Sequence, residues 1–445
     1  MSYVIPNSRL LSPLFGDAEL EAIFSDDYFI DRMVQVESQL AQVQGALGII
    51  PQSAAATIQL RLSSFKPDYA GLQADLELSG IPTKELIRQL KAHVGQTDAE
   101  AANFIHWGAT TQDIMDTALV LQAREGLAIL ENRLTQLIAG WAQIADQHRH
   151  TLMAGRTHSQ QALPITFGLK VANWIAPHLR HRQRLAELKP RLLVLQFGGA
   201  AGTLASLGDR GAAVQTALAE RLDLQLLPLP WHTQRDNIVE AAGWLSMVTG
   251  SLAKMAQDII LMAQSEVGEL RESGDPKRGG SSTMPQKANP VISETIIAAS
   301  RSNTAALATL HQAQIQEHER ATHGWQLEWM TLPQMFILTG NALQKGLFLS
   351  ENIVINQARM SQNVANSWGT MLAEKYSFVL AKKLGRSKAK AHMKTASEQA
   401  IQESKPLIEI LKESEPEIDW ESVGGEETYL GETQRFIDAL LSEIA

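Results

Sequence analysis

Cysteine is absent from all 445 residues of the chain. Disulfide bonds and thiolate metal sites are therefore excluded, and a chain of this composition fits a reducing compartment. The amino terminus, MSYVIPNSRL, has no basic segment followed by a long apolar run, so the sequence predicts no signal peptide. We therefore expect a cytoplasmic protein.

Long apolar runs are also missing. Runs such as Leu192–Leu195 and Ile259–Ala263 are far too short to span a bilayer, so no membrane association is expected. Positive charge is in deficit, because 39 Lys and Arg stand against 48 Asp and Glu. General affinity for nucleic acid needs clustered cations, so nucleic acid is not an expected partner. A small anionic ligand is still compatible, since local charge can oppose net charge.

Proline is sparse, and its gaps are the clearest structural signal. A helix interior excludes proline, so proline-free windows permit long helices. They cover residues 83–163, 231–275, 291–332 and 334–405.

Within these windows, apolar residues recur at helical spacing. In 236–271 they fall at i, i+3, i+4 and i+7, beginning with Ile238, Ala241 and Leu245. A single helix over this segment would be about 50 Å long, which favours a helix bundle. We expect two further long helices over 113–151 and 290–317.

Strand patterns are missing as well. No alternating run rich in Val, Ile and Thr demands a sheet, so the predicted fold class is all-α. We expect an N-terminal helical domain over 1–110, a central long-helix bundle over 111–355 and a C-terminal helical domain over 356–445.

Four breaks rich in Gly, Ser, Thr and other polar residues interrupt the helical windows. Loops on a rigid helical scaffold are natural places for chemistry. The breaks are HWGATTQD (106–113), GRTHSQQALPITFG (155–168), FGGAAGTLASLGDRG (197–211) and SGDPKRGGSSTMPQKANP (273–290).

The last break is chemically the richest. It combines a glycine pair, the hydroxyls of Ser281 and Ser282, the cation Lys287 and the amide Asn289. Backbone N–H groups beside a lysine and an amide can receive a carboxylate or an oxyanion. A neighbouring hydroxyl can act as an acid or base if its alkoxide is stabilised. Composition alone leaves a mobile surface loop as an equal alternative.

GSSTMPQKANP, residues 280–290, resembles the signature GSSxMPxKxNP of the fumarase/aspartase superfamily at every fixed position. GATTQD (108–113) and GRTHSQQALP (155–164) are similar to two further segments of that superfamily, in the expected order. The resemblance extends from Arg9 to the C-terminal segment. It implies an all-α fold with a central bundle of long helices. It also implies a homotetramer whose active sites form where segments of three subunits meet.

The resemblance also implies catalytic roles. Ser281 is the base that removes, or returns, the proton on the carbon beside a carboxylate. Lys287 and Asn289 hold that carboxylate and stabilise its aci form. His158 matches the general acid or charge-relay position, and Glu294 matches the glutamate that orients this histidine across the subunit interface.

Further residues match, or are candidates for, substrate contacts. For some of them a structural role is an open alternative: His106 could simply pack, and Arg9 could be a surface arginine. The neighbouring Asp113 is favoured as a helix N-cap. The substrate-binding candidates are Thr110, Thr111, Thr157, Lys287, Asn289, Arg235, His106, Arg9 and Arg320.

Two segments distinguish branches of the superfamily. PWHTQRDNIVE (230–240) resembles the adenylosuccinate-lyase-like branch, but HERATHGWQLEW (318–329) does not resemble the nucleotide-binding segment expected of that enzyme. Together with the other loops, the segment 318–329 is similar to the bacterial 3-carboxy-cis,cis-muconate cycloisomerase family. That family acts in protocatechuate breakdown within the β-ketoadipate pathway.

The implied reaction is that of an intramolecular lyase. It closes a small-molecule tricarboxylate into 4-carboxymuconolactone by adding a carboxylate across a C=C bond. The alternatives are adenylosuccinate lyase or another fumarate-releasing lyase, and a structural, non-catalytic member.

The nucleophilic carboxylate is already ionised near pH 7 and needs no general base. Protonation of the carbanion is then the step that the protein must assist, through Ser281. His158 either transfers a proton or only binds charge. There is no HExxH, cysteine cluster, EF-hand loop, GxGxxG after a strand or Walker A loop, so we expect no metal and no cofactor.

Overall fold

The computed structural model describes residues 8–273, 275, 277–320 and 322–444. The chain divides into two compact units built from discontinuous segments. Unit 1 comprises Met1–Asn132, His181–Thr249 and Ala299–Asn341, and unit 2 comprises Arg133–Arg180, Gly250–Ala298 and Ala342–Ala445. The division into three consecutive domains remains a prediction.

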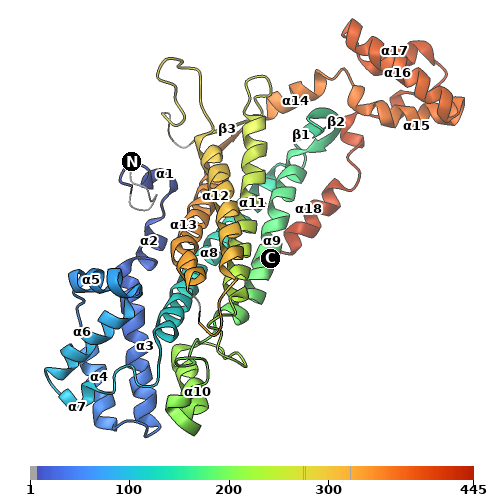
Figure 1. Ribbon diagram of the computed structural model, residues 1–445. Coiled ribbons are helices and arrows are strands. Elements are labelled where there is room, and N and C mark those ends of the chain that lie inside the picture. The colour runs from blue at the N-terminus through green and yellow to red at the C-terminus, as the bar shows by residue number, and fades with distance from the viewer. Residues whose placement is uncertain (1–7, 274, 276, 321, 445) are drawn as a thin grey trace. The chain divides into compact units, whose positions relative to one another are not determined.

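Unit 1 opens with a group of helices that Figure 1 draws in blue. Side chains cap several of them: Ser25, for example, accepts the N–H of Tyr28 at the start of α3. α10 packs against α3. Besides the long helices, the elements of unit 1 are α1 (Ser12–Phe15), α2 (Ala18–Ile23), α3 (Asp26–Ala46), α4 (Gln52–Leu62), α5 (Tyr69–Ser79), α6 (Thr83–Gly95), α7 (Ala99–Ala102), the 3-10 helix η2 (Ala205–Arg210) and α10 (Gly211–Leu222).

Five long helices contribute residues to both units. They are α8 (Thr111–Gln147), α9 (Phe167–Leu192), α11 (Asp236–Met262), α12 (Val291–Ala313) and α13 (His323–Asn352). Three of them, α8, α11 and α12, confirm that long helices lie where the sequence predicts them, but α11 ends at Met262 and not at residue 271. Their apolar residues are buried at helical spacing: on α8 in unit 1, Ile114, Ala118 and Leu121 have no exposed surface.

The other two long helices, α9 and α13, contain proline. Pro177 and Pro190 lie within α9, and Pro333 lies within α13. The expectation that a helix interior excludes proline is therefore wrong for this chain. Tertiary packing can hold a helix through the one hydrogen bond that each proline removes.

Two small antiparallel sheets in unit 2 were not anticipated. One pairs β1 (Leu152–Thr157) with β2 (Gln160–Thr166), and the other pairs β3 (Leu270–Glu272) with β4 (Ile353–Ile355). They are short additions to a helical protein, and the all-α class is confirmed. The first sheet coincides with one of the polar breaks, GRTHSQQALPITFG, so it determines where that motif lies.

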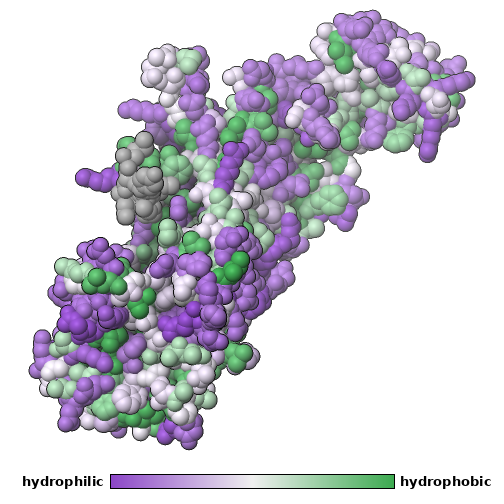
Figure 2. Space-filling model, in the orientation of Figure 1, coloured by the Kyte–Doolittle hydropathy of each residue, from purple (hydrophilic) through white to green (hydrophobic). Residues whose placement is uncertain are grey.

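The C-terminal part of unit 2 has its own apolar cluster. In Figure 1, α15, α16 and α17 lie together, and Tyr376 meets Trp420 edge-on at 5.8 Å between ring centroids. Figure 2 shows mostly hydrophilic residues over these helices. The elements are α14 (Gln357–Ala365), η3 (Thr370–Leu372), α15 (Ala373–Leu384), α16 (Arg386–Glu403), α17 (Leu407–Ser414), η4 (Glu421–Val423), η5 (Glu426–Thr428) and α18 (Thr433–Ser442). Among the described residues, no helix has the length and apolarity to cross a membrane.

Candidate active site

The signature loop closes on itself before α12 begins. The N–H of Asn289 donates to the carbonyl of Gly279 at 2.8 Å, and Gly280 forms an antiparallel bridge with Ala288. Gly279 has φ +66°, and a Cβ at this position would lie 2.1 Å from the Asn289 carbonyl oxygen. Only glycine permits this closure.

Ser281 lies at the start of the closed loop and is partly accessible. Its Oγ accepts hydrogen bonds from the backbone N–H groups of Thr283 (3.4 Å) and Met284 (3.2 Å). Two preformed donors stabilise negative charge on that oxygen, as an alkoxide requires. Lys287 is exposed and Asn289 is half-buried in the same loop.

The end of the loop is fixed by a buried carboxylate from β3. Glu272 accepts the backbone N–H groups of Ile292 (3.0 Å) and Ser293 (2.8 Å), and also the Ser293 hydroxyl (2.7 Å). A carboxylate at a helix N-terminus satisfies free N–H groups and complements the helix dipole. Glu294 follows in this first turn of α12, where it is exposed.

The β1–β2 hairpin places Thr157 and His158 at its exposed tip. Thr157 pairs with Gln160, which leaves a two-residue turn of His158 and Ser159 with φ of +50° and +65°. Such turns are normally formed by Asn-Gly, because glycine has no side chain and Asn tolerates positive φ better than most other residues. Backbone strain at a candidate catalytic histidine fits the tendency of strain to gather at functional sites.

The same hairpin is fastened within unit 2 by a bidentate ion pair. Arg156 donates to both carboxylate oxygens of Glu269, at 2.9 and 2.7 Å, and Asn363 donates to the same carboxylate at 2.8 Å. Glu269 is fully buried, so this contact is shielded from water. No contact links His158 to Glu294 among the described residues, and the orienting role of Glu294 stays a prediction.

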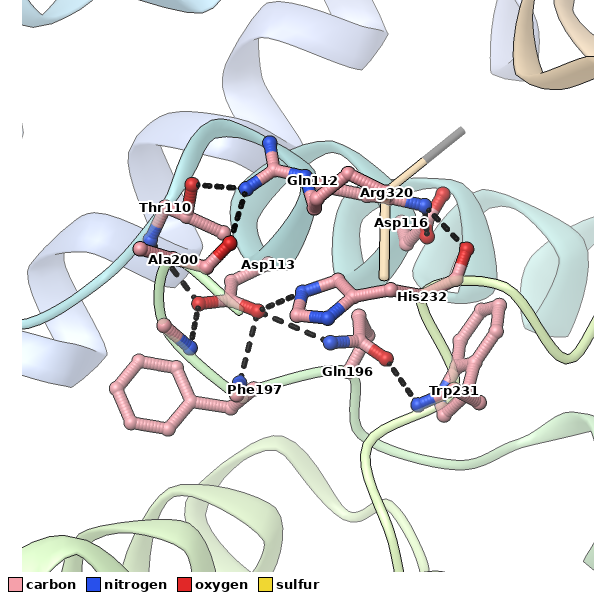
Figure 3. Close-up of polar contacts among 12 residues, drawn as sticks. Thr110, Gln112, Asp113, Asp116, Gln196, Phe197, Ala200, Trp231, His232 and Arg320 are labelled. Carbon is pink, nitrogen blue, oxygen red and sulfur yellow. Dashed lines mark hydrogen bonds and ion pairs between the residues drawn. The ribbon is translucent and has the colours of Figure 1, made fainter. Parts of the chain in front are cut away.

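In unit 1, the structure brings together two predicted substrate-binding residues, Thr110 and Arg320. Nη1 of Arg320 donates to the Thr110 hydroxyl at 2.6 Å and to the Ala200 carbonyl at 3.2 Å (Figure 3). Arg320 is half-buried and, in the described part of the chain, has no carboxylate partner. A cation held in place but not neutralised is a preformed receptor for a substrate carboxylate. Thr111, also half-buried, begins α8.

Asp113 forms hydrogen bonds with several segments of unit 1 and connects them (Figure 3). Its carboxylate is completely buried, and it lies in the first turn of α8. It is therefore not the N-cap residue favoured from the sequence, because Thr110 precedes the helix. Its two oxygens accept five hydrogen bonds, from Thr110 N (3.0 Å), Gly198 N (2.8 Å), Gly199 N (2.9 Å), Gln196 Nε2 (3.0 Å) and His232 Nε2 (2.9 Å).

His106 is held by a carboxylate that no motif included. Glu37 accepts the His106 backbone N–H at 3.0 Å, and its second oxygen lies 2.6 Å from Nδ1 of the ring. Burial by itself would lower the pKa of His106, but the charge and hydrogen bond of Glu37 outweigh it, and the pKa is raised. His106 is therefore more than a packing residue.

Arg235 does not fit the expected role. Its side chain has no exposed surface, and it forms ion pairs with Asp116 (2.6 Å) and with Glu328 while lying over the Trp231 ring at 4.7 Å. These carboxylates raise the pKa of Arg235 against the lowering effect of burial. A cation already matched by two buried carboxylates is not available to a substrate, so the geometry favours a structural role.

The predicted site residues thus fall into two groups. Those in unit 1 are Arg9, His106, Thr110, Thr111, Arg235 and Arg320. Those in unit 2 are Thr157, His158, Ser281, Lys287, Asn289 and Glu294. Arg9 is exposed. Sequence reasoning missed Glu37, Gln196 and His232, which act through long-range contacts that no local pattern signals. Among the described residues, no three His, Asp or Glu side chains gather as metal ligands would.

The chain is similar to known proteins over nearly its whole length. Residues 20–302 match the family model described as lyase. The chain is 39% identical to 3-carboxy-cis,cis-muconate cycloisomerase of Acinetobacter baylyi, over 98% of both chains. It is 38% identical to trans-aconitate decarboxylase 1 of Mycosarcoma maydis, over 97% of this chain and 88% of the other.

Solved structures are equally similar. The 3-carboxy-cis,cis-muconate lactonizing enzyme from Pseudomonas putida superposes with a TM-score of 0.93 at 39% identity, over 98% of this chain and 99% of the other. With the intact signature loop and the long-helix fold, these similarities establish that the chain belongs to the lyase family of the fumarase/aspartase superfamily.

Proposed function

We propose that this chain is an intramolecular lyase that interconverts 3-carboxy-cis,cis-muconate and 4-carboxymuconolactone. The observation that carries the proposal is the signature loop, complete in sequence and closed in structure, with two N–H donors on Ser281 Oγ. The full-length similarity to 3-carboxy-cis,cis-muconate cycloisomerases supports the same substrate.

The proposed reaction begins with the substrate's own carboxylate. One carboxylate oxygen forms a C–O bond to one carbon of a C=C bond, and the π electrons move to the neighbouring carbon beside another carboxylate. That electron pair spreads into the carboxylate as an aci form. Lys287 and Asn289 would stabilise the aci form, because a cation and an amide donor compensate its added negative charge.

Protonation of the carbanion completes lactonisation. The Ser281 hydroxyl delivers the proton and becomes an alkoxide, which the N–H groups of Thr283 and Met284 stabilise. The alkoxide regains a proton from solvent, and in the reverse direction it removes the proton from the lactone. The carboxylate needs no general acid when it leaves, so we assign His158, oriented by Glu294, to charge binding.

A substrate with three carboxylates needs several receptors besides Lys287. Arg320 with Thr110 is the best-formed of these in unit 1, and His106 supplies a further cationic group. Thr111, Thr157 and Arg9 are exposed or half-buried candidates for the remaining contacts. We propose that these residues meet in active sites shared between copies of a cytoplasmic homotetramer.

Ultraviolet assays with carboxymuconate and adenylosuccinate test the activity. We expect turnover of carboxymuconate that is lost in Ser281→Ala, with an unchanged circular dichroism spectrum. Gln286→Ala changes a variable position of the same loop and should keep the rate. Turnover of adenylosuccinate alone, or wild-type rates in Ser281→Ala, would refute the proposal.

A second candidate is decarboxylation of trans-aconitate, favoured by the similarity to the Mycosarcoma maydis enzyme. Both molecules are unsaturated tricarboxylates, so the same receptors could hold either. Carbon dioxide release from trans-aconitate, compared with lactone formation from carboxymuconate at equal enzyme concentration, decides between them.

A further inference from the structure

Glu37 lies in α3, far from every motif of the sequence, and its carboxylate is almost completely buried. It holds His106 at two points, the backbone N–H and Nδ1 of the ring, across 69 positions of sequence. An ionised carboxylate cannot donate, so Nδ1 must carry the proton. Only Nε2 is then left for a further partner.

The backbone of His106 is unusual as well. Its φ is +66°, a left-handed conformation that L-residues with a side chain rarely adopt. The bond from the His106 N–H to Glu37 holds the residue in this conformation. The neighbouring Trp107 carbonyl accepts a hydrogen bond at 2.7 Å from Gln44, which lies in α3 like Glu37. Two side chains of α3 thus fix the turn that leads to Thr110.

We propose that Glu37 is a positioning residue that keeps His106 as an imidazolium, so that its Nε2–H binds one carboxylate of the substrate. This inference rests on the proposed function, in which His106 is one of the cationic groups for a tricarboxylate. It adds a residue that acts through His106 rather than on the substrate itself.

The charged groups around His106 come from three helices. Glu37 on α3 and Asp113 on α8 favour the imidazolium, whereas Lys91 on α6 and burial oppose it. Glu37 is the strongest favourable influence, and the outcome is a raised pKa for His106. Without Glu37, burial and Lys91 should bring the pKa below its ordinary value of about 6.5. His106 would then be neutral near pH 7.5.

An NMR titration of protein labelled in the histidine ring tests the charge directly and needs no substrate. His106→Gln identifies the His106 signal. We expect that signal to titrate above the ordinary range in wild type and at clearly lower pH in Glu37→Gln. Glu125→Gln is a matched control, because Glu125 contacts Arg32 (3.5 Å) and Tyr28 of the same helix α3 but not His106. An unchanged His106 titration in Glu37→Gln would overturn the inference.

Kinetics test the consequence for the substrate. In Glu37→Gln we expect KM for carboxymuconate to rise roughly tenfold or more near pH 7.5, with a much smaller change in kcat. The ratio of the KM values of variant and wild type should shrink as pH falls, because His106 regains its charge. A ratio independent of pH would contradict the charge role.

The double variant Glu37→Gln/His106→Gln separates positioning from general damage. If Glu37 acts through His106, its replacement should add little to the effect of His106→Gln on KM. Fully additive effects would contradict the inference. Glu37→Asp keeps the negative charge and should retain the raised pKa of His106. It is the variant to titrate if Glu37→Gln does not fold, and a lowered pKa of His106 in it would contradict the inference. Absence of carboxymuconate turnover in wild type would refute the proposed function alone, because the titration still decides the role of Glu37.

Discussion

Nε2 of His232 lies 2.9 Å from Oδ1 of Asp113, although 119 positions separate the two residues, and both side chains are buried. Oδ2 of the same carboxylate accepts the N–H groups of Thr110 and Gly199, and Oδ1 also accepts the N–H of Gly198. One ionisable group therefore sets the positions of three chain segments, including the one that carries Thr110.

Asp113→Asn should damage both activity and stability. The amide keeps the shape but replaces one acceptor oxygen by an NH2 group, which then faces N–H donors. Leaving buried donors without acceptors costs about 1–3 kcal/mol each. We expect kcat/KM to fall at least roughly a hundredfold and the urea midpoint to drop, as measured by steady-state kinetics and denaturation. Asp209 is an exposed carboxylate in η2, so Asp209→Asn is the control and should behave like wild type.

Gly279→Ala should abolish turnover without unfolding the protein. The new Cβ would collide with the Asn289 carbonyl and force the signature loop open. Gly80 has a similar φ of +72° in the left-handed helical region but open space around it, so Gly80→Ala isolates the effect of backbone strain alone. That control should cost about 1–2 kcal/mol of stability and keep its activity. Equal activity in both variants would show that loop closure is unimportant.

Replacing Arg235 should mainly lower stability, whereas replacing Arg320 should mainly weaken substrate binding. Arg235→Gln leaves Asp116 and Glu328 buried without their cation, which should lower the free energy of unfolding by about 3–5 kcal/mol. Arg320→Gln removes a half-buried cation and should instead raise KM with little loss of stability. Urea denaturation and steady-state kinetics on both variants check this. An unchanged KM in Arg320→Gln would remove it from the proposed site.

Stability should depend on pH through His106. Its pKa is raised in the folded state, so the stabilisation is fully present below the unfolded value of about 6.5 and is lost as pH rises through the folded pKa. Urea denaturation across pH 6 to 9 should show this decline in wild type. In Glu37→Gln the decline should disappear, whereas Glu125→Gln should retain it.

Much of this fold follows from local sequence patterns. Proline-free amphipathic segments predict α8, α11 and α12 because helical periodicity is a property of the segment itself. α9 and α13 were not predicted because Pro177 and Pro190 lie inside α9 and Pro333 lies inside α13, and only packing with other elements offsets the lost hydrogen bonds.

The candidate site divides in the same way. The signature loop is contiguous, so the sequence alone identifies Ser281, Lys287 and Asn289 as neighbours. Glu37 is a single acidic residue on an amphipathic helix, and it acquires meaning only through a contact with a residue 69 positions away. Arg235 shows the converse, because its motif gave no sign that two distant carboxylates neutralise it.

The hairpin tip of His158 and Ser159 has a consequence for engineering. Two residues that disfavour positive φ occupy a turn that Asn-Gly would form with less strain. A selection for heat resistance alone would favour that replacement and would remove the histidine with it. If His158 binds substrate charge as proposed, stability has to be selected together with turnover, since at this tip the least strained turn and the histidine exclude each other.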